Sequence, residues 1–143
     1  MLERAIQIAV NAHKGQTDKA GKPYILHLVR VMEKGKTEEE KICGILHDLL
    51  EDTNWTISDL RKEGFSEEIM NALQCVTKKN NEPYSDFINR ISKNPLAIRV
   101  KLNDLEDNMD KSRLNNINEK DLQRFEKYSM AYEFLKNKLG KDL

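Results

Sequence analysis

The chain has 143 residues, 38% hydrophobic and 34% charged, and its 24 lysines and arginines balance 24 acidic residues. This length suits one domain, and a formal charge of zero argues against a nucleic-acid partner, because domains that bind nucleic acid are usually strongly basic. Two cysteines are too few for a disulfide framework, and no apolar run approaches the roughly 18 residues of a membrane span, so we expect a cytoplasmic protein without a membrane partner.

Apolar residues recur at helical spacing along nearly the whole chain, and no stretch has the period of two that is typical of a strand. Thr37 and Glu40 form a capping-box pattern, and Asn94-Pro95 places a proline directly after an N-cap residue. The sequence therefore predicts an all-α fold, one helical bundle of about seven or eight helices that spans residues 1–143. The predicted helices have these approximate ranges: 2–14, 23–34, 38–50, 56–63, 67–76, 83–91, 95–109 and 118–139.

Ionisable residues interrupt the strongly apolar third helix. His47 and Asp48 come first, and Glu51 and Asp52 follow at i, i+4 spacing on adjacent stripes of the helix. A solvated helix end would explain any one of these acids. However, they crowd the C-terminal end of the predicted helix, where the helix dipole disfavours negative charge. A bound cation would remove this objection.

The seventh predicted helix carries a second polar group. Lys101, Asp104 and Asn108 recur on one face beside an apolar stripe. A plain polar face explains this spacing about as well as a functional site does. We interpret three neighbouring acids as such a solvated face: Glu106, Asp107 and Asp110.

Residues from three predicted helices could share one divalent ion. His27 stands alone in the second helix, where packing in the core is the commoner role for a histidine. Together with His47, Asp48 and Asp104 it would supply two neutral nitrogens and two carboxylates. This mixed donor set suits manganese, iron, cobalt or zinc.

Three segments, AHKGQTDKAGKPYILH, GILHDLLEDT and VKLNDLEDNM, resemble in this order the hydrolase motifs of the HD superfamily. The resemblance is to the (p)ppGpp hydrolase domains of the RelA/SpoT family and their small stand-alone homologues. It implies an all-helical HD fold and a bound divalent metal, commonly Mn²⁺. It also implies that Glu51 and Asp52 activate or position the attacking water, and that Asn108 contacts the nucleotide near its sugar. The metal ligands that it implies are His27, His47, Asp48 and Asp104.

The sequence departs from the family pattern around the expected substrate. Asp18 stands in a loop near the nucleotide base, where the family usually has a basic residue. Its carboxylate could still accept hydrogen bonds from the N–H groups of guanine. Asp18, Lys19 and Lys101 are predicted substrate contacts, although most lysines near the motifs have simple solvation as the alternative. Within the third motif, Leu105, Asp107 and Asp110 replace an arginine, a histidine and an arginine.

These features predict a metal-dependent phosphohydrolase whose partner is a small-molecule nucleotide. The most specific expectation is removal of the 3′-pyrophosphate of guanosine 3′,5′-bis(diphosphate), ppGpp, by a metal-activated water. Glu51 is the candidate general base, and Asp52 is its partner or orienter. Two alternatives stay open: the same chemistry on another phosphorylated nucleotide, and a non-catalytic nucleotide-binding HD protein.

Overall fold

The computed structural model describes residues 1–114 and 116–141, which contain nine α-helices and one 3₁₀ turn but no strand. The single isolated bridge in these residues joins Thr17 to Pro23. The all-α prediction is therefore confirmed. In chain order the helical elements are α1 (Leu2–Ala12), α2 (Ile25–Lys34), α3 (Glu38–Leu46), α4 (Leu49–Asp52), α5 (Ile57–Glu63), α6 (Glu67–Cys75), α7 (Tyr84–Ile91), α8 (Pro95–Asn108), η1 (Lys111–Arg113) and α9 (Glu119–Lys141).

The predicted start signals begin real helices. The Thr37 hydroxyl accepts the backbone N–H of Glu40 at 3.1 Å, and the Asn94 side chain accepts that of Ala97 at 3.0 Å. Each bond satisfies one of the backbone N–H groups that the first turn of a helix leaves without an intrahelical partner. These caps determine where α3 and α8 begin, and both helices carry residues of the site described below.

The third helix is shorter than the sequence predicts. It ends at Leu46, and a separate one-turn helix, α4, begins at Leu49. Between them, His47 Nδ1 donates a hydrogen bond to the Gly44 carbonyl at 2.7 Å. In a continuous helix that carbonyl would accept from the amide of Asp48, four residues later. The neighbouring acids therefore do not crowd the C-terminal end of one long helix, and that prediction was wrong.

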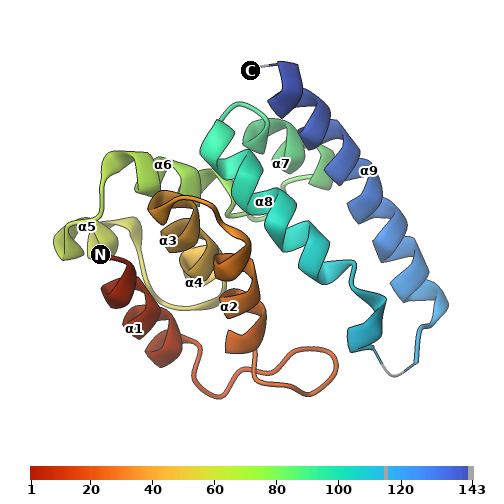
Figure 1. Cartoon of the computed structure of the whole chain (residues 1–143), viewed down its shortest axis with the longest axis horizontal. Coiled ribbons are helices and arrows are strands. Elements are labelled where there is room, and N and C mark those ends of the chain that lie inside the picture. Colours follow the sequence, from red (N-terminus) through yellow and green to blue (C-terminus); the bar gives the residue numbers. More distant parts are fainter. Residues whose placement is uncertain (115, 142–143) are drawn as a thin grey trace.

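Helix α3 lies at the centre of the bundle and packs against α1, α2, α6 and α8 (Figure 1). Six of its nine residues are buried and they lie on several faces of the helix, as expected for a helix in the middle of a core. Gly44 allows α3 to approach α2 closely, because a Cβ at this position would lie 3.0 Å from the Met32 Cα of α2. This contact brings the backbones of α2 and α3 together and places the histidines of the two helices near each other.

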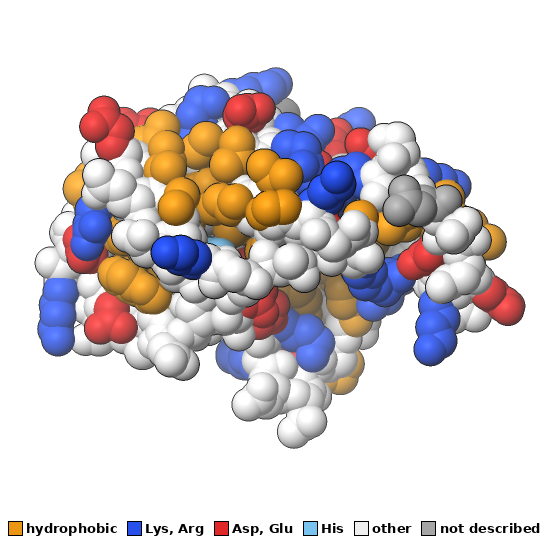
Figure 2. Space-filling model, turned by 90° about the horizontal axis from the view of Figure 1, so that it is seen from below, with side chains coloured by type: hydrophobic (Ala, Val, Ile, Leu, Met, Phe, Trp, Pro, Cys, Tyr) orange, Lys and Arg blue, Asp and Glu red, His pale blue; other side chains and the backbone are white. Residues whose placement is uncertain are grey.

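The long helix α9 runs along α8 on the opposite side from α1 (Figure 1). None of the helices in the described part of the chain is both long and apolar enough to cross a membrane. Figure 2 views the molecule from below, and on this face lysines and arginines are interspersed with acidic side chains around a hydrophobic patch. This mixture agrees with the formal charge of zero.

Candidate metal centre

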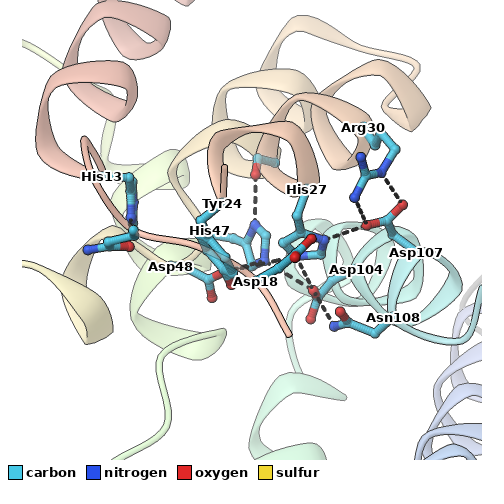
Figure 3. Close-up of polar contacts among 12 residues, drawn as sticks. His13, Asp18, Tyr24, His27, Arg30, His47, Asp48, Asp104, Asp107 and Asn108 are labelled. Carbon is cyan, nitrogen blue, oxygen red and sulfur yellow. Dashed lines mark hydrogen bonds and ion pairs between the residues drawn. The ribbon is translucent and has the colours of Figure 1, made fainter. Parts of the chain in front are cut away.

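The four predicted metal ligands meet at one point between helices (Figure 3). His27 comes from α2, His47 from the end of α3, Asp48 from the start of α4 and Asp104 from α8. Asp104 Oδ1 lies 3.0 Å from His27 Nε2 and 3.2 Å from His47 Nε2. Asp48 Oδ2 lies 3.2 Å from His47 Nε2 and 4.0 Å from His27 Nε2.

This donor set fits a divalent cation. Nitrogen and oxygen ligands that share one ion at about 2.0–2.2 Å each can lie no more than about 4.4 Å apart. The four distances between a histidine nitrogen and an aspartate oxygen meet this limit, and His27, His47 and Asp48 each offer a ligand atom within 4.8 Å of the other two. Two imidazoles and two carboxylates also match the ligand chemistry of a first-row transition metal. The residues therefore could hold one such ion, with His27 and His47 each presenting Nε2.

Hydrogen bonds on the far nitrogens orient both imidazole rings. The Nδ1 of His47 donates to the Gly44 carbonyl, and the Nδ1 of His27 donates to Asp107 Oδ2 at 2.5 Å. Such bonds fix the ring orientation, so that Nε2 of each ring points into the site and meets Asp104 Oδ1. Both rings thus present Nε2 to the two carboxylates of the site.

Asp107 is not part of a solvated face, so that interpretation of the sequence was wrong. It is only 3% exposed, and besides His27 it accepts Arg30 Nε at 2.7 Å. Arg113 of η1 reaches it from another side, with Nη2 at 3.3 Å from Oδ2. Burial alone would raise the pKa of Asp107, but the hydrogen bonds from His27 and Arg30 outweigh it and lower the pKa to about 2. The other two acids of that group, Glu106 and Asp110, are exposed as predicted.

Asp104 is surrounded by donors on every side. Besides the two histidines it accepts Lys101 Nζ at 2.9 Å and Asn108 Nδ2 at 3.0 Å. Burial would raise the pKa of Asp104, but the charges of Lys101 and His47 hold it well below its usual range. Lys101 is half-buried beneath these contacts, with its ammonium 5.3 Å from the centre of the Phe87 ring. Simple solvation, the alternative considered for the lysines, is therefore excluded for Lys101.

Asp48 has a hydroxyl partner that the sequence did not single out. The Tyr24 hydroxyl donates a short hydrogen bond to Asp48 Oδ2. Burial would raise the pKa of Asp48, but His47 and this bond outweigh it and lower the pKa. The charges of Asp48 and Asp104 likewise outweigh the burial of His47 and raise its pKa well above the usual value. The carboxylates and imidazoles therefore compensate each other as ion pairs.

Glu51 and Asp52 form a second carboxylate cluster with Asp48, in which one oxygen of each residue lies within 4.8 Å of the others. Both side chains are exposed at the surface of α4. Partial burial, followed by the charges of Asp48 and Asp52, raises the pKa of Glu51. Glu51 Oε1 also accepts the backbone N–H of Lys78 at 3.1 Å, which holds its side chain toward the α6–α7 connection.

His13 supports this cluster from α1. Its ring is buried, and Nδ1 lies 2.8 Å from the Gln16 side-chain oxygen. The Gln16 amide in turn donates to the backbone carbonyl of Asp52 at 3.2 Å. His13 thus joins the loop after α1 to α4 through Gln16.

A cavity of about 330 Å³ opens beside the metal ligands. Its wall includes His27 and Asn108 from the ligand side and Lys19 from the loop after α1. Asp18 also lines it, but Oδ1 of this residue accepts the backbone N–H groups of Ala20 and Lys22, both at 2.9 Å. Only Asp18 Oδ2 is therefore available to a ligand, and the substrate contacts predicted for Asp18 and Lys19 stay predictions.

No protein-family model matches the chain. Among curated proteins, it is 33% identical over 120 residues to the guanosine-3′,5′-bis(diphosphate) 3′-pyrophosphohydrolase of Aquifex aeolicus, a match that covers 76% of this chain and 17% of that protein. It is 40% identical over 79 residues to the protein of the same name from Borreliella burgdorferi, covering 52% of this chain and 12% of the relative. A GTP pyrophosphokinase of Streptomyces coelicolor is 31% identical over 121 residues, a match that covers 76% of this chain and 14% of the relative. The chain thus spans 12–17% of the length of these curated relatives.

Among solved structures, the chain is similar to that of a metazoan SpoT orthologue, described as hydrolysing ppGpp and as playing a role in starvation responses. The TM-score is 0.78, and the alignment covers 98% of this chain and 92% of the other at 20% sequence identity. At this identity the likeness shows the fold, which is the helical fold that the motifs predict.

Proposed function

We propose a function from the premise that the chain is an HD-type domain of the (p)ppGpp hydrolase-like kind. Hydrolases of this kind depend on a divalent metal. We infer that this domain is a metal-dependent phosphohydrolase that removes the 3′-pyrophosphate of ppGpp, and that Mn²⁺ is its metal. The observation that carries the proposal is the meeting of His27, His47, Asp48 and Asp104 beside two further carboxylates.

The four ligand residues would hold the cation between α2, α3 and α8. When bound, a divalent cation supplies a water of lowered pKa and a positive charge that stabilises phosphoryl oxygens. Lys101 contributes a second, permanent positive charge through its contact with Asp104. It balances the buried carboxylate of Asp104, and because an ammonium has three N–H donors, the substrate contact predicted for Lys101 stays a prediction.

Glu51 is the base in this proposal. A carboxylate with a raised pKa is suited to accept a proton near neutral pH. Water adds to the phosphorus of the 3′-pyrophosphate, and its proton passes to Glu51. The bond between that phosphorus and the ribose 3′ oxygen breaks, and the oxygen takes up a proton. The products are GDP and pyrophosphate.

Asn108 would hold the nucleotide near its sugar. It lines the cavity beside His27, and its amide is oriented by Asp104. A nucleotide that enters the cavity would therefore place its ribose beside Asn108, next to the metal ligands.

The test is hydrolysis of a nucleotide panel with Mn²⁺, with products separated by anion-exchange chromatography. We expect GDP and pyrophosphate from ppGpp, and no turnover when a chelator removes the metal. Turnover of another nucleotide alone would replace the substrate but keep the chemistry. Metal and nucleotide binding without turnover of any nucleotide would support the non-catalytic alternative.

A further inference from the structure

One arginine in the cavity has no part in the chemistry above. Arg113 belongs to η1, after the last metal-ligand helix, and its guanidinium lines the cavity with His27 and Asn108. Its Nη2 donates to the backbone carbonyl of Asp107 at 2.7 Å and lies 3.3 Å from Asp107 Oδ2. Because Asp107 is buried and bonded to His27, these contacts hold the guanidinium in a defined position.

The other amino group of Arg113 forms an ion pair with Asp18 but no hydrogen bond with it. Nη1 lies 3.6 Å from Asp18 Oδ2, which is beyond hydrogen-bond distance, and it donates to no acceptor in residues 1–114 and 116–141. Asp18 is held just as firmly, because its Oδ1 accepts the N–H groups of Ala20 and Lys22. The cavity wall thus presents an N–H donor and a carboxylate acceptor side by side. The Asp107 carbonyl holds the donor in place, and the loop amides hold the acceptor.

This pair matches one edge of guanine. Guanine offers the O6 acceptor beside the N1–H donor, whereas adenine offers the N6 amine beside the N1 acceptor, so the order of donor and acceptor is opposite. Phe125 and Tyr128 of α9 add aromatic side chains to the same wall, which suits the stacking of a base. A purine whose edge carries an acceptor beside a donor would therefore match this wall.

We propose that Arg113 and Asp18 together select guanine, with Arg113 Nη1 donating to O6 and Asp18 Oδ2 accepting from N1–H. The inference deepens the proposed function, on which it rests, by naming the residues that choose the base. It gives Asp18 a direct contact with the base, and it makes Arg113 of η1 a specificity-determining residue.

The test measures binding rather than hydrolysis. GDP, inosine 5′-diphosphate and ADP are titrated into the protein with chelator present, by isothermal calorimetry. Inosine keeps both O6 and N1–H, so it should bind like GDP, and ADP should bind about tenfold or more weakly. Arg113→Met should weaken the binding of GDP and of inosine 5′-diphosphate by about tenfold or more and leave the binding of ADP nearly unchanged. Asp18→Asn, which keeps an acceptor for the loop amides, should reduce the same preference.

Arg30→Met is the matched control. Arg30 also bonds to Asp107 but does not line the cavity, so its loss should leave the ratio of GDP to ADP affinity unchanged. An equal loss of GDP and ADP binding in Arg113→Met would mean that Arg113 contacts phosphate, and it would overturn the proposal. An equal effect of Arg30→Met on the ratio would overturn it too, because Arg113 would then act only through Asp107.

Thermal unfolding checks that each variant folds, and Arg113→Lys provides a second variant if Arg113→Met does not. A lysine keeps the charge but cannot hold Asp107 and donate to the base at once, so the preference for GDP should still fall. A full preference in Arg113→Lys would contradict the proposal. If ppGpp is not hydrolysed but the preference for guanine depends on Arg113, the proposed function fails and this inference stands.

Discussion

Glu51 and Asp52 are neighbouring carboxylates with different expected roles. We predict that Glu51→Gln lowers turnover by about 10²–10⁴, because the amide cannot accept the proton of the attacking water. Metal content should stay unchanged, since Glu51 is not one of the four proposed ligands. Turnover with Mn²⁺ and elemental analysis of the same sample measure both effects.

Asp52→Asn is the companion variant. The charge of Asp52 helps to raise the pKa of Glu51, so its removal should lower that pKa. The acidic limb of the rate profile, where Glu51 becomes protonated, should therefore move to lower pH. An unchanged limb in Asp52→Asn, or full turnover in Glu51→Gln, would assign the base role to another group.

Asp107 differs from its neighbour Glu106 by burial and by its bond to His27. We predict that Asp107→Asn weakens metal binding by about 10–100-fold, the usual cost of losing a group that orients a ligand histidine. A competition titration with a metal-sensitive dye gives the affinity. Glu106→Gln, an exposed change one residue away, should leave it unaltered. Equal affinities in the two variants would show that His27 needs no carboxylate support.

At the scale of elements, the α2–α3 contact brings His27 and His47 together. We predict that Gly44→Ala destabilises the protein by about 1–3 kcal/mol, because the new Cβ would lie 3.0 Å from the Met32 Cα and push the two backbones apart. Metal affinity should fall with stability, since the helices carry ligands of the same ion. Urea unfolding and metal titration measure the two effects.

Gly140→Ala is the control for this change. Among the described residues, a Cβ at Gly140 in α9 meets no atom within 4 Å beyond its chain neighbours and the backbone of its own helix, so alanine should be neutral or stabilise the helix by up to about 1 kcal/mol. Its metal affinity should equal that of the original protein. A Gly44→Ala protein of unchanged stability would mean that α2 can shift away without cost.

At the scale of the whole molecule, one ion would join segments that are far apart in the chain. His27, His47 and Asp104 come from α2, α3 and α8, so a bound metal stabilises their packing. We predict that Mn²⁺ at 100 times its Kd adds about 2.7 kcal/mol to the free energy of unfolding and raises Tm by about 5–10 °C. A thermal scan with and without chelator measures the shift.

His47→Ala removes one ligand and should abolish most of this shift. The variant has to be compared with and without metal, because loss of the imidazole also changes the buried ion pairs. A rise in Tm with Mn²⁺ as large as that of the original protein would place the stabilising ion elsewhere.

Much of the fold was predictable because its determinants are local. The caps Thr37 and Asn94 and the period of the apolar residues predict where α3 and α8 begin, without reference to any distant residue. The break after Leu46 was not predictable in this way. At the break, the His47 side chain donates a hydrogen bond to the Gly44 backbone carbonyl. The apolar pattern of the sequence continues across the break and so predicts an uninterrupted helix.

The site was predictable only in part, for a related reason. Histidine beside aspartate in an apolar helix is unusual enough to indicate a metal ligand, and residue type alone supports that inference. Asp107 carries no such signal, because an aspartate near exposed acids looks like any other polar surface residue. Its spacing of three from Asp104, on the buried side of α8, was the available indication, and burial decides it.

The sequence by itself determined the helical class of this protein, its helix starts and the residue types that could bind a metal, since these depend on neighbours along the chain. The motifs also predicted that His27, His47, Asp48 and Asp104 share one ion, whereas only the tertiary structure decided that the buried Asp107 supports them. The close α2–α3 approach at Gly44 and the packing of α8 bring His27, Asp104 and Asp107 together, across about 80 residues of chain. Arg113 and Asp18 meet in the same way, because their contact exists only once η1 and the loop after α1 are packed on one cavity.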